Sequence, residues 1–138
     1  MKRKTLLTVL LFSIILTSCS SDSDNNSNAS IKISPPGWIQ GAWYLEGNTN
    51  NTGYKFSNDD FCLITFNTQS CFKEQLRLAD NSGTITNIKE LVTDNSYSIE
   101  ITISSQVLTY KFEKISSTEI EWVNHPLGDL TEVIYIKQ

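Results

Sequence analysis

Two neighbouring segments of the chain show a strict alternation of apolar and polar side chains. Tyrosine and isoleucine take every second position over residues 97–104, with serine, glutamate and threonine between them. The alternation repeats over residues 108–113, and the short polar stretch 104–106 joins the two segments. Because successive side chains of a strand point to opposite faces, the pattern predicts a β-hairpin with one apolar and one polar face.

The rest of the chain after Trp43 is also a series of short apolar segments, separated by clusters of Asn, Asp, Ser and Gly. We count nine candidate strands, among them residues 71–78, with connections too short for a parallel crossover. Residues 84–92 have an apolar spacing closer to that of a helix, so this segment is predicted as a bulged strand or a short helix. A meander with one apolar face exposes two edges unless it curls until they meet. The predicted fold is therefore all-β, a small antiparallel meander of eight to nine strands that closes into a barrel.

Residues 38–43, with the sequence Trp-Ile-Gln-Gly-Ala-Trp, mark the start of the folded domain. Two prolines before this stretch make a stiff extended lead, and Gly41 allows a tight turn before the first strand. Trp43 gives that strand a large aromatic anchor. We expect Trp38, Gly41 and Trp43 to plug one end of the barrel, and the domain to span residues 35–138.

The first 18 residues have the features of an export signal. Three basic residues precede an apolar run, residues 6–16, which is shorter than the roughly 20 apolar residues of a permanent membrane span. The sequence that follows, Leu-Thr-Ser-Cys at residues 16–19, resembles the bacterial lipobox, whose cysteine is diacylated on sulfur and becomes the first residue of the mature chain. The resemblance implies that Cys19 is the site of lipid attachment. An ordinary signal peptide that happens to contain Cys19 is the alternative.

Residues 19–34 are predicted to form the lipidated cysteine and a flexible polar tether, because they offer almost nothing to bury. The start of this stretch, residues 19–24, resembles the Ser/Asp-rich surface-export signals that follow the lipidated cysteine in lipoproteins of the Bacteroidetes. Ser20 is not an aspartate, so the inner-membrane retention signal of enteric bacteria is missing. We expect a lipid-anchored protein of the outer membrane, exposed at the cell surface. A generic polar linker without sorting content is the alternative.

The charge of the chain argues against one class of partner. Removal of residues 1–18 takes away three of the 11 basic residues and none of the 15 acidic ones, which leaves a formal charge of −7 from eight basic and 15 acidic residues. Nucleic-acid binding depends on basic residues that neutralise phosphates, so no nucleic-acid partner is expected. Attachment to the membrane is expected through lipid alone.

The tripeptide Gly41-Ala42-Trp43 resembles the Gly-x-Trp signature that opens the first strand of lipocalins and other calycins, and residues 38–40 stand where those proteins have a short helical turn. Several lipocalin-like lipoproteins of the Bacteroidetes begin in a similar way, with a Pro-Pro-x-Trp-Ile lead. The resemblance implies a lipocalin-like barrel with a ligand-binding role. Three features depart from it. Lys137 stands on the last strand where lipocalins place an arginine over the tryptophan, the domain is short, and neither a terminal helix nor a helical lid is expected. Any cavity should therefore be small.

Cys62 and Cys71 flank Phe66 and Asn67 symmetrically. A hairpin centred on that pair would place the two cysteines opposite each other, where cross-strand Cβ atoms lie about 4.5–5.5 Å apart. In an exported protein this arrangement predicts a disulfide. A metal site would need more ligands than two thiols and one distant histidine, and a redox pair would more naturally be Cys-x-x-Cys. We expect no metal and no cofactor.

The remaining candidates for chemistry have structural interpretations. His125 lies in a loop with no recognisable nucleophile or carboxylate spaced to use it, so it is interpreted as a turn residue. Asp59 and Asp60 suit a turn better than a calcium site, and Glu119 and Glu121 suit the solvated side of a strand. No catalytic residues are predicted, and an enzyme is not expected.

Apolar residues at inward positions either fill the core or line a pocket for an apolar ligand, and filling is the default in a small barrel. The candidate ligand-lining residues are Tyr54, Phe56, Tyr97, Ile99, Ile101, Tyr110, Phe112 and Trp122. The leading hypothesis is a surface-tethered protein that binds a small hydrophobic or amphipathic ligand in its barrel. The alternative is a module with a solid core whose loops, residues 48–53 and 124–129, bind another protein or a glycan.

Overall fold

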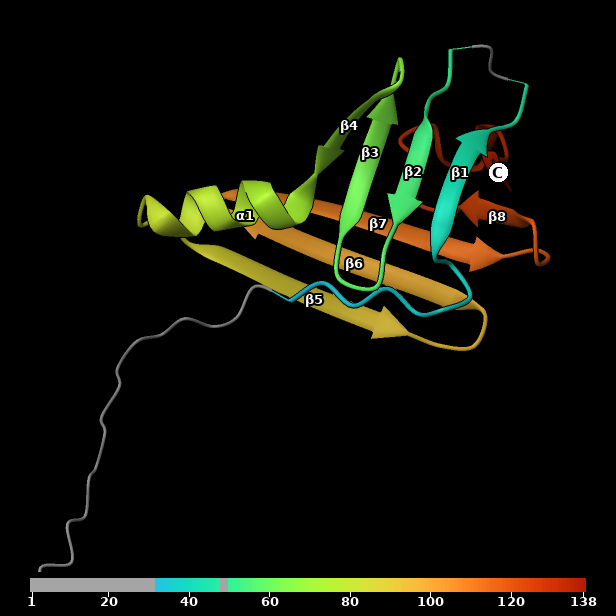
Figure 1. The fold of residues 1–138 in the computed structure, drawn as a ribbon. Helices are drawn as coiled ribbons and strands as arrows, with labels where there is room; N and C mark the ends of the chain where they lie inside the picture. Colours follow the sequence, from blue (N-terminus) through green and yellow to red (C-terminus); the bar gives the residue numbers. More distant parts are fainter. Residues whose placement is uncertain (1–31, 48–49) are drawn as a thin grey trace, which may run out of the picture.

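The computed structural model describes residues 32–47 and 50–138, and Figure 1 shows how they fold. The predicted export signal, Cys19 and most of the predicted tether lie outside the described residues. Within the described ranges, no helix has the length and apolar character that a membrane span requires.

The described part of the chain forms nine strands, one α-helix and one short 3-10 helix. In chain order these elements are β1 (Gly41–Leu45), β2 (Gly53–Phe56), β3 (Phe61–Thr65), β4 (Thr68–Cys71), α1 (Phe72–Asn81), β5 (Thr86–Val92), β6 (Ser96–Ile103), β7 (Gln106–Lys114), β8 (Glu119–Trp122), η1 (Gly128–Leu130) and β9 (Ile134–Lys137).

All nine strands belong to one antiparallel sheet, in the order β4-β3-β2-β1-β9-β8-β7-β6-β5. The sheet curls into a half-barrel, and in Figure 1 strands β1–β4 cross over β5–β7. The prediction of an all-β meander of eight to nine strands is confirmed, and residues 84–92 contain a strand, not a helix. The end strands β4 and β5 are not paired with each other in this order. Helix α1 joins them and packs against β3 and β5.

Helix α1 shows that the prediction of a strand over residues 71–78 is wrong. Phe72 and Leu76 are both buried, and residues four apart lie on the same face of a helix. Glu74 and Arg77 form an ion pair of 2.6 Å between exposed side chains. The apolar residues at positions 76 and 78 suggested the alternation of a strand, but only Leu76 of these two contributes to the core.

One end of the half-barrel is closed by the lead segment, residues 32–40. Ile33 and Ile39 of this segment are buried, and Trp43 of β1 is completely buried beside them. Ile33 falls within the predicted tether, residues 19–34, so the predicted start of the domain at residue 35 is too late: the folded part already includes Ile33. Trp43 donates a hydrogen bond of 2.6 Å from Nε1 to the carbonyl oxygen of Ile39. Trp38 donates from Nε1 to the carbonyl oxygen of Thr93, which follows β5, at 3.1 Å. We call this the closed end and the opposite end the open end. β1 runs from the closed end to the open end, and each neighbouring strand runs in the opposite direction. The β1–β2, β3–β4 and β6–β7 connections therefore lie at the open end.

Candidate functional site

The side chains predicted to line a ligand pocket form the core of the half-barrel. Six of the eight are buried, and Tyr110 and Trp122 are partly buried. Their rings contact one another: the ring of Tyr54 lies 5.0 Å from that of Phe112 and 4.9 Å from that of Tyr135. Aromatic rings at these separations pack edge to face or tilted, as in protein interiors. These residues therefore fill the space that they enclose, and of the eight only Ile101 also lines a surface groove described below.

A carboxylate on the inner face of β5 ties the lead segment to the wall of the half-barrel. Glu90 accepts a hydrogen bond of 2.6 Å from the hydroxyl of Tyr97 and two from the backbone N–H of Ser34, at 2.9 and 3.0 Å. Burial raises the pKa of Tyr97 far above its usual range, and the Glu90 carboxylate raises it further, so this phenol stays protonated as a donor. Sequence reasoning missed Glu90. The available signal was a polar residue at an inward position between Ile88 and Val92.

A lysine takes the position over the buried tryptophan where lipocalins have an arginine. The Nζ atom of Lys137, on β9, lies 5.0 Å from the centre of the Trp43 ring, within the range of a cation–π contact. Gly41 makes room for this side chain, since a Cβ there would lie 2.7 Å from Cε of Lys137. The backbone at Gly41 also has a φ of +129°, a conformation that other residues rarely adopt.

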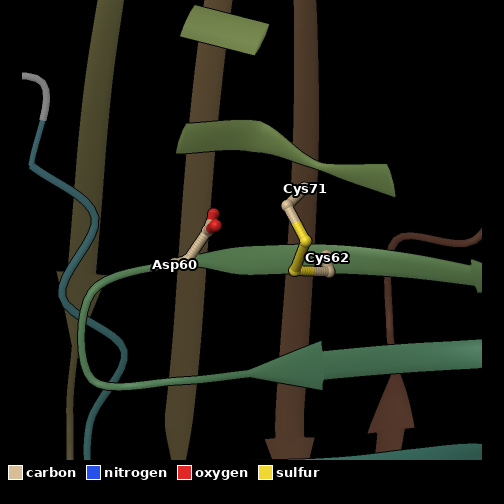
Figure 2. A group of neighbouring side chains, drawn as sticks. All are labelled: Asp60, Cys62 and Cys71. Carbon is tan, nitrogen blue, oxygen red and sulfur yellow. A yellow bond between two sulfur atoms is a disulfide. The ribbon is translucent and has the colours of Figure 1, made fainter. Parts of the chain in front are cut away.

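The disulfide predicted between Cys62 and Cys71 is present, with an S–S distance of 2.10 Å. The two residues face each other directly in the β3–β4 register, and Phe66 and Asn67 form the turn with positive φ values of 49° and 63°. Figure 2 shows the bond together with Asp60. These three residues form the one cluster of potential metal ligands among the described residues. Because the two sulfur atoms are bonded to each other, the cluster offers no thiolate pair to a metal.

Asp60 has a structural role at the start of α1. Its Oδ1 atom accepts hydrogen bonds from the backbone N–H groups of Phe61, at 2.7 Å, and Lys73, at 2.9 Å. Cys71, at the N-cap position of the helix, makes no capping hydrogen bond with its own side chain. Asp60 therefore supplies from a distant turn the acceptor that a helix start requires. Asp59 forms an exposed ion pair with Lys73, which lowers the pKa of the Asp59 carboxyl.

His125 and Glu119 are also held by their neighbours, whereas Glu121 lies opposite another carboxylate. The ring of His125 lies against that of Trp122 at 4.6 Å, and its Nδ1 accepts a hydrogen bond of 3.2 Å from the backbone N–H of Leu127. Glu119 accepts from the hydroxyl of Ser116 at 3.3 Å, and Glu121 faces Glu113 across the β7–β8 pair. None of these arrangements pairs a nucleophile with a base.

A surface groove lies between α1 and strands β6 and β7, at the open end of the half-barrel. We name it the α1 groove. It has a volume of about 430 Å³, and its lining residues are Gln75, Leu78, Ile101, Ile103, Gln106 and Leu108.

The floor of the α1 groove belongs to the inner face of the sheet. In the β6–β7 register Ile101 pairs with Leu108, and Ile103 pairs with Gln106, so these residues share the face of the core. Ile101 is buried, yet Leu108 remains 40% exposed. The reason is that, within residues 32–47 and 50–138, no strand pairs with both β4 and β5 to complete the wall, and α1 covers this end only in part. Sequence reasoning placed Leu108 on the apolar face of the hairpin and missed the groove, because the groove exists only where the helix lies.

Comparison with protein-family models, with curated proteins and with solved structures finds no match for the chain. The resemblance to lipocalins therefore stays a prediction at the level of family, while the all-β fold of the described residues stands on the structure itself.

Proposed function

We propose that this protein is a surface-tethered lipoprotein of the outer membrane whose folded domain binds a small amphipathic molecule in the α1 groove. The tether part of the proposal is supported by the sequence of residues 1–34, with Cys19 as the lipidated residue. The test is to express the full chain in cells and to measure how much of it is in the membrane fraction. We expect Cys19→Ala to remove the protein from that fraction.

The observation that carries the ligand proposal is the uncovered inner face at the open end. Apolar side chains of soluble proteins are normally buried once they lie on the core side of a sheet. Here Leu108 and Leu78 both line the groove, with 40% and 56% of their surface exposed. A molecule that covers them would remove apolar surface from water without any rearrangement of the packed core below.

The chemistry of the groove favours a ligand with an apolar body and a polar end. Its walls carry four aliphatic side chains and the two amides of Gln75 and Gln106. No Asp, Glu, Lys or Arg is among the groove residues. Burial of an alkyl chain contributes about 0.8 kcal/mol for each methylene, before the costs of association are subtracted. For an open groove of this size we expect dissociation constants in the micromolar range or weaker. A micromolar constant corresponds to a binding free energy of about −8 kcal/mol.

The experiment is a titration of the chain that begins at residue 19, with Cys19 replaced by serine, against a fluorescent fatty-acid probe. We expect saturable binding that is weakened at least tenfold by Leu108→Glu, because the new carboxylate lies in the apolar floor. Val107→Glu is the matched control. Val107 directly precedes Leu108 on β7, points to the outer face and is 55% exposed.

Equal weakening by the two substitutions would show that the probe does not bind in the α1 groove. No saturable binding to the unsubstituted chain would remove the ligand proposal altogether.

A further inference from the structure

A second hollow lies on the outer face of the sheet, at the open-end tips of β1 and β9. We name it the outer hollow. It has a volume of about 660 Å³, and the residues that matter for its chemistry are Tyr44, Glu46, Asn51, Asn67, Ile136 and Gln138. Tyr44 follows the inward-facing Trp43 in β1, so its side chain belongs to the opposite face of the sheet. Leu45, which packs against the core, also lines the outer hollow, but the outer hollow and the α1 groove share no lining residue.

The floor of the outer hollow is a flat pair of apolar side chains. Tyr44 and Ile136 are directly opposite each other in the β1–β9 register, and both are partly buried. A tyrosine ring beside an aliphatic side chain offers a planar surface with a polar hydroxyl at one edge. Such a surface suits a ligand that is itself flat, with an apolar face and polar edges.

The rim of the outer hollow carries amides and one carboxylate. The Nδ2 atom of Asn51 donates a hydrogen bond of 2.8 Å to Oδ1 of Asn67, which joins the β1–β2 loop to the tip of the β3–β4 hairpin. Both residues have left-handed backbone conformations, with φ values of 46° and 63°. The side chains of Glu46 and Gln138 make no hydrogen bond to any other described residue. The rim thus presents both donors and acceptors, and an amide offers two of each.

The charge of the lining selects among polar ligands. Glu46 is the one charged side chain among the described residues of the outer hollow, and no Lys or Arg accompanies it. A phosphate or a sulfated or uronic polymer would meet a carboxylate without a compensating cation, which disfavours anionic ligands. A pyranose ring has one face of C–H groups for a tyrosine ring and a rim of hydroxyls, each both donor and acceptor. We propose that the outer hollow binds a neutral oligosaccharide, with Tyr44 as the stacking platform and Asn51, Asn67 and Glu46 as hydroxyl partners.

The test is native gel electrophoresis of the full chain in a mild detergent, with starch, laminarin, xylan or galactomannan in the gel. We expect at least a twofold reduction of mobility in one of these gels relative to a gel without polysaccharide. Tyr44→Ala should abolish the reduction, and Tyr44→Phe should preserve most of it, because phenylalanine keeps the ring. If Tyr44→Ala and Tyr44→Phe change the mobility reduction by the same amount, stacking on the Tyr44 ring is contradicted.

A double substitution separates the role of the two amides from the role of the backbone. Glycine adopts positive φ without strain, so Asn51→Gly with Asn67→Gly removes both amides while it keeps the loop and hairpin conformations. We expect this variant to keep its melting temperature and to lose the mobility shift. Leu108→Glu, in the α1 groove, should leave the shift unchanged, so that failure of this inference and failure of the proposed function are distinguishable. Unchanged mobility of the double variant, or no shift of the unsubstituted chain in any gel, would overturn the inference.

Discussion

At the scale of single residues, Gly53 shows how closely β1 and β2 approach each other. A Cβ at this position would lie 1.9 Å from the carbonyl oxygen of Trp43, so the two strands would have to separate. At Gly41 the added atom would meet only the flexible end of Lys137. The sequence does not reveal this difference, because Gly53 reads as the last residue of an Asn-rich loop. The position of Lys137 over Trp43 depends on the β1–β9 pairing of distant segments, and only the resemblance to lipocalins pointed to it.

We predict that Gly53→Ala destabilises the domain by about 3 kcal/mol, as expected for overpacking against backbone atoms. For a domain of this size, that loss lowers the melting temperature by roughly 10–20 °C. Thermal unfolding followed by circular dichroism measures the effect. Gly37→Ala is the control, because a Cβ added at Gly37 would have no other atom within 4 Å and the backbone there does not have a positive φ. Similar melting temperatures for the two variants would contradict the close approach of β1 and β2 at Gly53.

At the scale of elements, the cysteine spacing was sufficient to predict the β3–β4 hairpin and its register, because a disulfide across a two-residue turn admits few alternatives. The alternating pattern was likewise sufficient for β6 and β7. Helix α1 could not be predicted in the same way. Its start lacks a local capping side chain, and the acceptor comes from Asp60, which lies in another connection of the sheet. The α1 groove was missed for the same reason, since α1 forms one of its walls.

Asp60 gives a prediction for this element. We expect Asp60→Ala to destabilise the domain by about 1–2 kcal/mol, because the backbone N–H groups of Phe61 and Lys73 lose their shared acceptor. Amide hydrogen exchange of α1 should accelerate more than that of β6. Asp60→Asn keeps an acceptor oxygen and should retain most of the stability. Asp59→Ala is the control for charge, because Asp59 makes only exposed contacts, an ion pair with Lys73 and a hydrogen bond from the Ser57 hydroxyl. Protection of α1 that is the same in Asp60→Ala as in the unsubstituted chain would exclude the capping role.

At the scale of the whole molecule, the half-barrel has one end closed by the lead segment and Trp43, and one end left open beneath α1. The sequence predicted the closed end from residues 38–43 and the curled meander from its strand pattern. It could not distinguish side chains that fill the core from side chains that line a site, because both are apolar and inward. Tyr54 and Phe112 are in ring contact, whereas Leu108, on the same face, is left uncovered. We therefore propose ligand binding at the open end and not within the aromatic core.

The most direct test is an NMR titration of the isotope-labelled domain, residues 19–138 with Cys19→Ser, with lauric acid. The account predicts saturable changes of amide chemical shift in α1, in the last residues of β6 and in the first residues of β7, with the signals of Trp38 and Trp43 unmoved. Changes concentrated on the lead segment and Trp43, or spread through the aromatic core, would contradict the account, as would a spectrum that does not respond to the fatty acid.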